Sequence, residues 1–535
     1  MSLSRGALAA GAAVTAAAAV TLTVVLWPDS SDSARRSGSE NSASASSAAP
    51  TPSPTRSYPL SKAPRAIPAV REHTAAHGPG WRPGKGSAVV IADGSKGLAD
   101  EGRLLAGELK IAYRGAVPAR AGDVELALTP ADKGGSESYT LRTHDGRVTV
   151  SGPGQAGVFY GTRTLKQSVR ADGVMPEGEV RDRPDRPQRG FNLDIARKPY
   201  TAAWIEDRLR EMADLKLNQL GLHFSDDQAF RIESDTHPEV VSPDHLTKAQ
   251  VRHIVALADR LHIQVVPEID SPGHLGAVLR AHPDLQLRNV SGVASQGSLD
   301  ISKPGAAKLV DELLGEYTEL FPGAYWHLGA DEYLALMARD PAASYPQLQQ
   351  AAVKKYGSKA GIEDLATGWL NDRAAVVRPH GKQPKAWNDG LFRDSIVQAD
   401  KNIEIEYWTG KEYGARSPEE YLREGRKVLN LNDEFLYYVL GQPNDFVYPT
   451  GKRIYEQWTP LVLRGTTAVP KRYSDQILGG RFAVWGDLPN AQTAAQVAQG
   501  IRMPLRATAQ KLWDPGKPKL SWDGFRTLAG EIDKG

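Results

Sequence analysis

Short β-rich runs recur along the chain from residue 187 onward, separated by stretches with helical spacing. The runs read FNLDIA, QLGLHF, IQVVPEID, AYWHLG, PKAWND, IEIEYW, KVLNLN and RFAVWG. The helical stretches include AAWIEDRLREMADLK, TKAQVRHIVALADRLH and GAAKLVDELLGEYTEL. Strands that alternate with helices predict a parallel sheet. Eight such repeats predict an α/β fold, a (β/α)8 TIM barrel over residues 187–535.

The residues before the barrel, 60–186, predict a small α+β domain. SAVVIA and DVELAL are strand-like, and SYTLRTHDGRVTVSG predicts a hairpin with Asp145-Gly146 at a two-residue turn. DEGRLLAGELKIAY has helical spacing, and QAGVFYGTRTLKQSV predicts a helix that closes the domain. The apolar positions expected to contribute to the core from the first of these helices are Leu104, Leu105, Leu109 and Ile111.

Three glycines in this domain resemble a nucleotide-binding motif. Gly152, Gly154 and Gly157 fit G-x-G-x-x-G between a strand and a helix. A dinucleotide site also needs a parallel strand after the helix, whereas loop-like sequence follows here, so we interpret the glycines as a tight turn. P-loop, G-x-S-x-G, H-x-H and H-E-x-x-H motifs are absent, and the lack of cysteine excludes a cysteine nucleophile and Cys-ligated zinc. We expect no cofactor.

The N-terminal segment predicts export. Arg5 precedes an uncharged run from Gly6 to Trp27, which is long enough to span a bilayer as a helix. The first good Ala-x-Ala cleavage site lies far downstream, at 43–45, so residues 1–27 predict an uncleaved signal-anchor, with a cleaved signal peptide as the alternative. Residues 28–58 are dominated by Ser, Ala and Pro and predict a disordered linker. The domain is therefore expected outside the cytoplasm, secreted or anchored to the cell membrane.

Polar and aromatic residues follow nearly every run of the predicted barrel, where the C-terminal ends of the strands carry the chemistry. In chain order they are Asp194 and Arg197; His223, Asp226 and Asp227; Glu268, Asp270 and His274; His327, Asp331 and Glu332; Trp387, Asn388 and Asp389; Trp408; Tyr437 and Tyr438; and Trp485 and Asp487. A single acid after a strand is explained by helix capping. Because almost all the runs end in this way, we expect a functional cluster.

Carboxylates mixed with aromatic rings suggest a sugar site, because rings pack on the apolar faces of pyranoses while carboxylates and arginine bind hydroxyls. The competing interpretation is a metal site built from Asp and His. The spacing of Asp270 and His274 instead suits a supporting hydrogen-bond relay. The formal charge of +2, from 65 basic and 63 acidic residues, provides no electrostatic case for nucleic acid.

Asp331 and Glu332 stand side by side in WHLGADEY. Like charges this close resist ionising together, so one pKa of the pair is expected to rise in a partly dry site. Most retaining glycosidases hold two carboxylates about 5 Å apart on either side of the scissile bond. Adjacent residues share one side instead, so one protonates the leaving oxygen while the other contacts the substrate. The nucleophile is then unassigned, and a 2-acetamido sugar can supply it through its carbonyl oxygen.

With these residues the sequence resembles glycoside hydrolase family 20, the β-N-acetylhexosaminidases and lacto-N-biosidases. RGFNLDIAR, HFSDDQAFRI, PEIDSPGH, HLGADEY and FAVWGD match its motifs in order, and the resemblance covers about residues 60 to 510. It implies that Glu332 is the general acid/base. It also implies that Asp331 orients the acetamido group and stabilises an oxazolinium-like intermediate.

The resemblance implies further roles, and we expect no metal because no clear ligand set is present. Sugar hydroxyls are expected on Arg189 and Asp487, the acetamido carbonyl on Tyr437 (or its neighbour Tyr438), and aromatic walls from Trp387, Trp408 and Trp485. The supporting network is expected from Asp226, Asp270, His274 and His327.

The implied activity is that of an exported retaining hydrolase that removes terminal β-linked N-acetylhexosamine. Departures from the family pattern include Ala330, where many members have Gly, and also Lys198, Phe230 and LNLNDEFLYY. The last resembles the branch containing lacto-N-biosidases, so release of a galactosyl-GlcNAc disaccharide is the alternative. A non-catalytic sugar-binding wall protein is a third possibility.

Overall fold

The computed structural model describes residues 57–130, 134–411 and 415–535, and the chain from Ser57 to Gly535 forms one compact unit. The predicted export segment and nearly all of the predicted linker lie outside the described residues. Within the described ranges, no helix is long and apolar enough to cross a membrane.

The N-terminal part of this unit is the predicted small α+β domain, built on a seven-stranded sheet in the order β1-β7-β5-β6-β4-β2-β3. Its strands are β1 (Glu72–Ala75), β2 (Ala88–Ile91), β3 (Ala112–Gly115), β4 (Val124–Leu128), β5 (Tyr139–His144), β6 (Arg147–Gly152) and β7 (Gly178–Asp182). Its helices are η1 (Lys96–Leu98), α1 (Ala99–Leu109) and α2 (Gln155–Asp172).

The predicted hairpin is present as β5 and β6, with His144 paired to Arg147. Asp145 and Gly146 form its turn with φ of 50° and 66°, the left-handed values that a type I′ turn requires. Helix α1 is shorter than its apolar spacing suggests, because Lys110 takes a left-handed conformation and ends it at Leu109. Ile111 therefore leads into β3 rather than completing the helix.

The glycine motif is explained by close packing rather than by a nucleotide. A Cβ at Gly154 would lie 2.6 Å from the carbonyl oxygen of Ser136, and one at Gly157 would lie 2.1 Å from that of Ser138. The strand after α2 is β7, which pairs antiparallel with β5. A dinucleotide fold needs a parallel strand at this point.

The rest of the unit is the predicted barrel. Its strands are β8 (Gln188–Asp194), β9 (Gln219–His223), β10 (Gln264–Glu268), β13 (Tyr325–His327), β14 (Gln383–Trp387), β15 (Glu404–Tyr407), β16 (Val428–Asn430) and β18 (Ile477–Trp485). Neighbours in this order are parallel, and β16 pairs with β18, which in turn pairs with β8 and closes the barrel. All eight predicted strands are confirmed. A further strand, β17 (Tyr437–Val439), extends the sheet beside the C-terminal half of β18.

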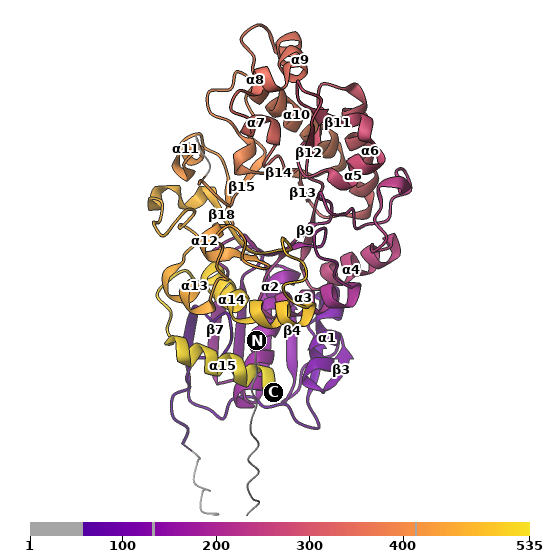
Figure 1. Cartoon of the computed structure of the whole chain (residues 1–535). Helices are drawn as coiled ribbons and strands as arrows, with labels where there is room; N and C mark the ends of the chain where they lie inside the picture. Colours follow the sequence, from indigo (N-terminus) through magenta and orange to yellow (C-terminus); the bar gives the residue numbers. More distant parts are fainter. Residues whose placement is uncertain (1–56, 131–133, 412–414) are drawn as a thin grey trace, which may run out of the picture. The chain divides into compact units, whose positions relative to one another are not determined.

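An α-helix follows each barrel strand except β14, which leads to β15 through a 3-10 turn alone (Figure 1). These helices are α3 (Ala202–Asp214), α4 (Lys248–Arg260), α6 (Pro304–Leu320), α10 (Ile362–Val377), α11 (Pro418–Arg423), α13 (Gly451–Gln457) and α14 (Ala494–Trp513). Helix α4 shows why they form: Thr247 and Gln250 make a capping box, and Val251, Ile254 and Ala258 are buried on one face.

Shorter elements are inserted between the strands and the helices. After β9 and β10 they are η2 (Pro238–Val240), α5 (Gly276–Ala281), η3 (Pro283–Leu285) and the hairpin of β11 (Gln286–Arg288) and β12 (Ala294–Leu299). Later insertions are α7 (Leu334–Met337), α8 (Pro341–Ser344), α9 (Pro346–Tyr356), η4 (Arg378–His380), η5 (Asn388–Gly390), α12 (Asp433–Leu436) and η6 (Lys471–Gln476). The last helix, α15 (Trp522–Lys534), packs against α2 of the small domain and α13 of the barrel.

Candidate active site

A chain of buried charges starts at His223, the last residue of β9. Its Nε2 lies 2.7 Å from Asp226 Oδ2, and its Nδ1 lies 3.1 Å from Glu268 Oε2 at the end of β10. Burial by itself opposes the charged imidazole, but the two carboxylates outweigh it and raise the pKa of His223 to about 10. His223 therefore carries a proton at neutral pH.

Asp226 connects His223 to the acid pair through His274. The Nδ1 atom of His274 lies 3.3 Å from Asp226 Oδ1. Its Nε2 lies 3.7 Å from Asp331 Oδ2 and 3.4 Å from Glu332 Oε2. Although burial opposes its charge, Asp226 and Asp331 raise the pKa of His274 well above its ordinary value. A protonated His274 therefore lies between a supporting carboxylate and the two candidate catalytic acids.

The relay suggested by the spacing of Asp270 and His274 has a different member. The carboxylate that contacts His274 Nδ1 is Asp226. Asp270 accepts a hydrogen bond from the backbone N–H of Ala330 at 2.9 Å and so holds the loop that carries the acid pair. Asp226, Asp270 and His274 thus lie together beside the acid pair.

The backbone before the acid pair is strained. Gly329, Ala330 and Glu332 have φ of 70°, 83° and 47°, and only the first is a residue that adopts such values freely. A Cβ at Gly329 would lie 1.6 Å from Asp270 Oδ1, so glycine is required there. The close packing of Gly329 on Asp270 fixes the position of the loop that carries the two acids.

The carboxyl groups with a raised pKa are neighbours of the acid pair. Burial and the charge of Asp331 raise the pKa of Asp270, and likewise that of Asp389, well above the ordinary value. The hydrogen bond and charge of His274 instead lower the pKa of Glu332. The expectation of a raised pKa within the pair is therefore wrong for Glu332, because sequence did not show that an imidazolium would face it.

The predicted aromatic residues meet in one place. The ring of Trp485 lies 5.8 Å from the rings of Trp387 and Tyr437, and Trp408 stacks on Tyr437 at 5.8 Å and 5°. The indole N–H of Trp387 donates to Glu268 Oε1 at 2.7 Å, which ties this wall to the charge network. The indole N–H of Trp408 donates to Asp389 Oδ1 at 2.9 Å.

Of the two adjacent tyrosines, Tyr437 faces the site. It is buried against Trp408 and Trp485, and burial together with the charge of Asp331 raises its pKa well above the ordinary value. Tyr438 points to the other side of β17, where its hydroxyl donates to Gln492 and its ring stacks on Tyr448.

Arg189 does not lie at the site, which corrects the expectation that it binds sugar. It stands near the start of β8 with its side chain buried against the small domain. Its guanidinium makes two hydrogen bonds of 2.9 Å to the carboxylate of Glu137 and donates to the backbone oxygens of Lys216 and Arg186. All of its donors are engaged far along the strand from the catalytic end.

Arg197 lies at the site instead. Its Nη2 atom is 2.7 Å from Asp226 Oδ2 and its Nη1 atom is 3.1 Å from Asp194 Oδ2. The guanidinium carbon lies 5.5 Å from the ring centroid of Trp485. Asp194, Asp226 and Asp487 outweigh burial and raise the pKa of Arg197, so it stays charged. Asp487 is exposed at the rim after β18.

His327 occupies the floor of the site. Its Nδ1 lies 3.2 Å from Glu268 Oε1, and its ring packs 4.5 Å from that of Trp387. Four more residues of the expected cluster, to which sequence analysis assigned no individual role, take part in these contacts: Arg197, His223, Glu268 and Asp389. Their position at strand ends is visible in the sequence. The contacts that bring them into the site join different strands and are visible only in the structure.

Among the residues that the structure describes, Asp270, His274 and Asp331 could hold a metal at the site, since one ligand atom from each lies within 4.8 Å of the others. The imidazole of His274 would have to lose its proton first, because metals bind the neutral ring. Its raised pKa opposes that loss.

The fold and the site together define a (β/α)8-barrel protein with an acidic, aromatic-walled site at the C-terminal ends of its strands. The chain belongs to glycosyl hydrolase family 20. The model of that family's catalytic domain matches residues 187–515, and the model of its domain 2 matches residues 63–183.

Comparison with individual proteins agrees. A lacto-N-biosidase of Bifidobacterium bifidum is 32% identical over 85% of this chain and 40% of its own length. A beta-hexosaminidase of Porphyromonas gingivalis is 30% identical over 52% of this chain and 38% of its own. The structure of a mutant Streptomyces plicatus beta-hexosaminidase in complex with GlcNAc covers 90% of this chain and 96% of its own, with a TM-score of 0.69 and 23% identity, and shows the same fold. The chain thus spans about two fifths of the length of the first two relatives.

Proposed function

We propose that this chain hydrolyses the glycosidic bond of a β-linked N-acetylhexosamine residue, with the substrate's own acetamido group as nucleophile. The observation that carries the proposal is the environment of Asp331. Its Oδ1 atom is buried and has no hydrogen-bond partner among the described residues, and its charge acts on Tyr437 in the aromatic wall. A buried acceptor beside aromatic rings and a neighbouring carboxylate suits an acetamido N–H on a pyranose.

In the first step, the acetamido carbonyl oxygen attacks C1 while the bond from C1 to the leaving oxygen breaks. Glu332 donates its proton to that oxygen, and Asp331 accepts the amide N–H and stabilises the positive charge of the oxazolinium ion. In the second step, Glu332 takes a proton from water as the water oxygen attacks C1 and the ring reopens. Two displacements at C1 retain its configuration.

His274 supports the first step. Glu332 must be protonated to act as an acid, yet the bond to His274 favours its carboxylate form. His274 Nε2 lies 3.4 Å from Glu332 Oε2, so its charge stabilises the carboxylate that Glu332 becomes as it gives its proton to the leaving oxygen. Asp226 stabilises the imidazolium from its other side.

Sugar binding is assigned to the side chains gathered around the acid pair. Trp387, Trp408 and Trp485 provide apolar surfaces for the pyranose, and the Tyr437 hydroxyl suits the acetamido carbonyl. Arg197 takes the hydroxyl-binding role first expected of Arg189, because it lies beside Trp485 at the catalytic end of β8.

The test is release of aryl alcohol from an aryl β-GlcNAc. Glu332→Gln is expected to lower kcat by at least a thousandfold, and Asp331→Asn by at least a hundredfold, since each removes a group that acts on the transition state. Glu319→Gln, an exposed acid on α6, is the matched control and is expected to behave as wild type. Wild-type rates in either site variant would reject the assignment.

A second candidate is release of a galactosyl-GlcNAc disaccharide. It is favoured by the 32% identity over 85% of the chain to a lacto-N-biosidase, and by the exposure of Asp487 and Leu488, which leaves the rim after β18 open. Product size on a galactosyl-GlcNAc-capped oligosaccharide separates the two: a disaccharide product selects this candidate, and turnover of only uncapped GlcNAc ends rejects it.

We also propose export, based on residues 1–27 of the sequence. Cell fractionation is expected to place the full chain in the membrane fraction with its catalytic unit accessible to external protease. A chain found in the cytosol would reject this.

A further inference from the structure

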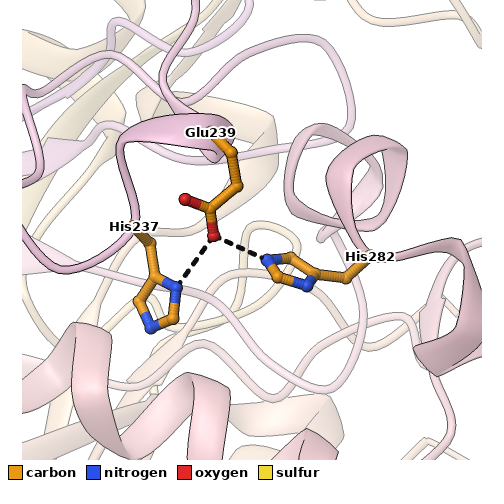
Figure 2. A group of neighbouring side chains, drawn as sticks. All are labelled: His237, Glu239 and His282. Atoms are coloured by element: carbon orange, nitrogen blue, oxygen red, sulfur yellow. Dashed lines mark hydrogen bonds and ion pairs between the residues drawn. The ribbon is translucent and has the colours of Figure 1, made fainter.

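Two histidines and a glutamate form a cluster that plays no part in the proposed reaction. His237 and Glu239 belong to the segment after β9 that forms η2, and His282 follows α5. Figure 2 shows both imidazole rings directed at the same carboxylate oxygen. Glu239 Oε1 lies 3.0 Å from His237 Nδ1 and 3.0 Å from His282 Nε2. We propose that this cluster is a binding site for a divalent transition-metal ion of the zinc type.

The distances suit such an ion. The three ligand atoms all lie within 4.8 Å of one another. Zinc binds nitrogen and oxygen at about 2.0–2.2 Å, so tetrahedral ligands lie about 3.4 Å apart. The carboxylate of Glu239 needs to withdraw by only a few tenths of an ångström to admit the ion. Two imidazoles and one carboxylate favour zinc, cobalt or nickel over magnesium and calcium, which prefer oxygen ligands.

A fourth residue orients His237 as metal-bound histidines are oriented. Its Nε2 lies 3.2 Å from Glu312 Oε2 on α6, so a neutral ring that donates its Nε2 proton to this carboxylate presents the Nδ1 lone pair to Glu239 Oε1, 3.0 Å away. Without the metal, a proton on Nδ1 makes the hydrogen bond to Glu239. The metal ion takes the place of that proton, because histidine binds metals through a deprotonated ring nitrogen.

The site is both accessible and ordered by its surroundings. The side chains of Glu239 and His282 are 44% and 25% exposed, so an ion can enter and water can complete its coordination. The segment before His237 is held by Glu316 of α6, which accepts from the hydroxyl of Ser234 and the backbone N–H of Asp235, each at 2.6 Å. Little conformational entropy is then lost on binding.

The ion would join the two loops that carry the supporting network. The loop after β9 bears Asp226, and α5 begins just after His274. These loops are already linked at the start of α5, where the backbone N–H of Gly276 donates to Asp227 Oδ1 at 2.9 Å. A metal at Glu239 and His282 links them at the other end of the same helix, so its role is structural.

The experiment uses the full chain in detergent, without a polyhistidine tag and after chelator treatment. Titration with Zn²⁺ in a calorimeter is expected to show one ion per chain, and Co²⁺ is expected to give the visible absorbance of a tetrahedral site. Zn²⁺ is also expected to raise the Tm. His282→Asn and Glu239→Gln are expected to weaken binding at least tenfold and to abolish the rise in Tm.

Two controls separate this site from others. His253→Asn, which changes a largely exposed ring on α4, is expected to bind as wild type. Asp331→Asn alters the acid cluster and is expected to leave binding intact. Absence of saturable binding to the wild type, or binding that survives His282→Asn, would overturn the proposal. These measurements do not depend on catalysis, so they test the metal site independently of the proposed function.

Discussion

Arg189 provides a sharp test of the structure, because sequence resemblance and geometry assign it different roles. Arg189→Met removes a buried guanidinium that makes two 2.9 Å hydrogen bonds to Glu137. Breaking a buried ion pair costs about 3–5 kcal/mol. Glu137 keeps the amide of Asn218 at 3.1 Å and the hydroxyl of Tyr160 at 3.0 Å, which favours the lower end. The carbonyl of Lys216 loses its donor and adds about 1 kcal/mol. We therefore expect a loss of about 4 kcal/mol.

Unfolding entropy of about 2 cal/mol/K per residue converts this loss into a fall in Tm of about 4 °C for a unit of this size. Thermal unfolding followed by circular dichroism measures it, with Arg142→Met as the control because Arg142 makes an exposed pair with Glu179. The double variant with Glu137→Gln should show coupling between the two positions. KM for the aryl substrate should stay within about twofold. A Tm within 1 °C of wild type together with a tenfold rise in KM would refute the placement of Arg189.

Three further outcomes are expected. His274→Gln removes the charge that lowers the pKa of Glu332, so the pKa of Glu332 should rise. The basic limb of the kcat/KM profile should then move to higher pH while the maximum falls. A basic limb at the wild-type pH would count against the contact between His274 and Glu332. Hydrogen bonds from Lys248, Ser234 and the segment after Ser234 outweigh burial and lower the pKa of Glu316 to about 2. The contribution of Glu316 to stability is therefore present above about pH 4.5 and is lost as pH falls towards 2. Glu316→Gln should cost about 1–3 kcal/mol at pH 7 in urea unfolding and should remove this dependence of stability on acidic pH, whereas an unchanged dependence would exclude Glu316 as its source. Gly329→Ala puts a Cβ against Asp270 and should lower kcat at least tenfold, and normal turnover would show that the loop adapts.

The barrel was predictable because its signals are local. Each strand carries its own β-rich run, and helices such as α4 carry their own caps and apolar stripe. The end of α1 was not predictable from spacing, because Lys110 leaves the helical conformation while Ile111 still continues the apolar pattern.

The sequence predicted most of the residues that make up the site, but not which of them contact one another. Strand-end position identified the acids, His274 and the tryptophans, and it also pointed to Arg197. Selection of Arg189 followed family resemblance, and only the register of β8 shows that it stands at the other end of the strand. The partner of His274 likewise depends on contacts between different strands.

The central claim is that the substrate's acetamido group attacks C1 beside Asp331 and Glu332. The most direct measurement is kcat/KM for aryl β-glycosides whose N-acetyl group carries zero, one, two or three fluorines, with anomeric configuration of the product followed by NMR. Fluorine weakens the carbonyl oxygen as a nucleophile, so the account predicts a steep stepwise fall in rate with retained configuration. Rates independent of fluorine, or an inverted product, would contradict it.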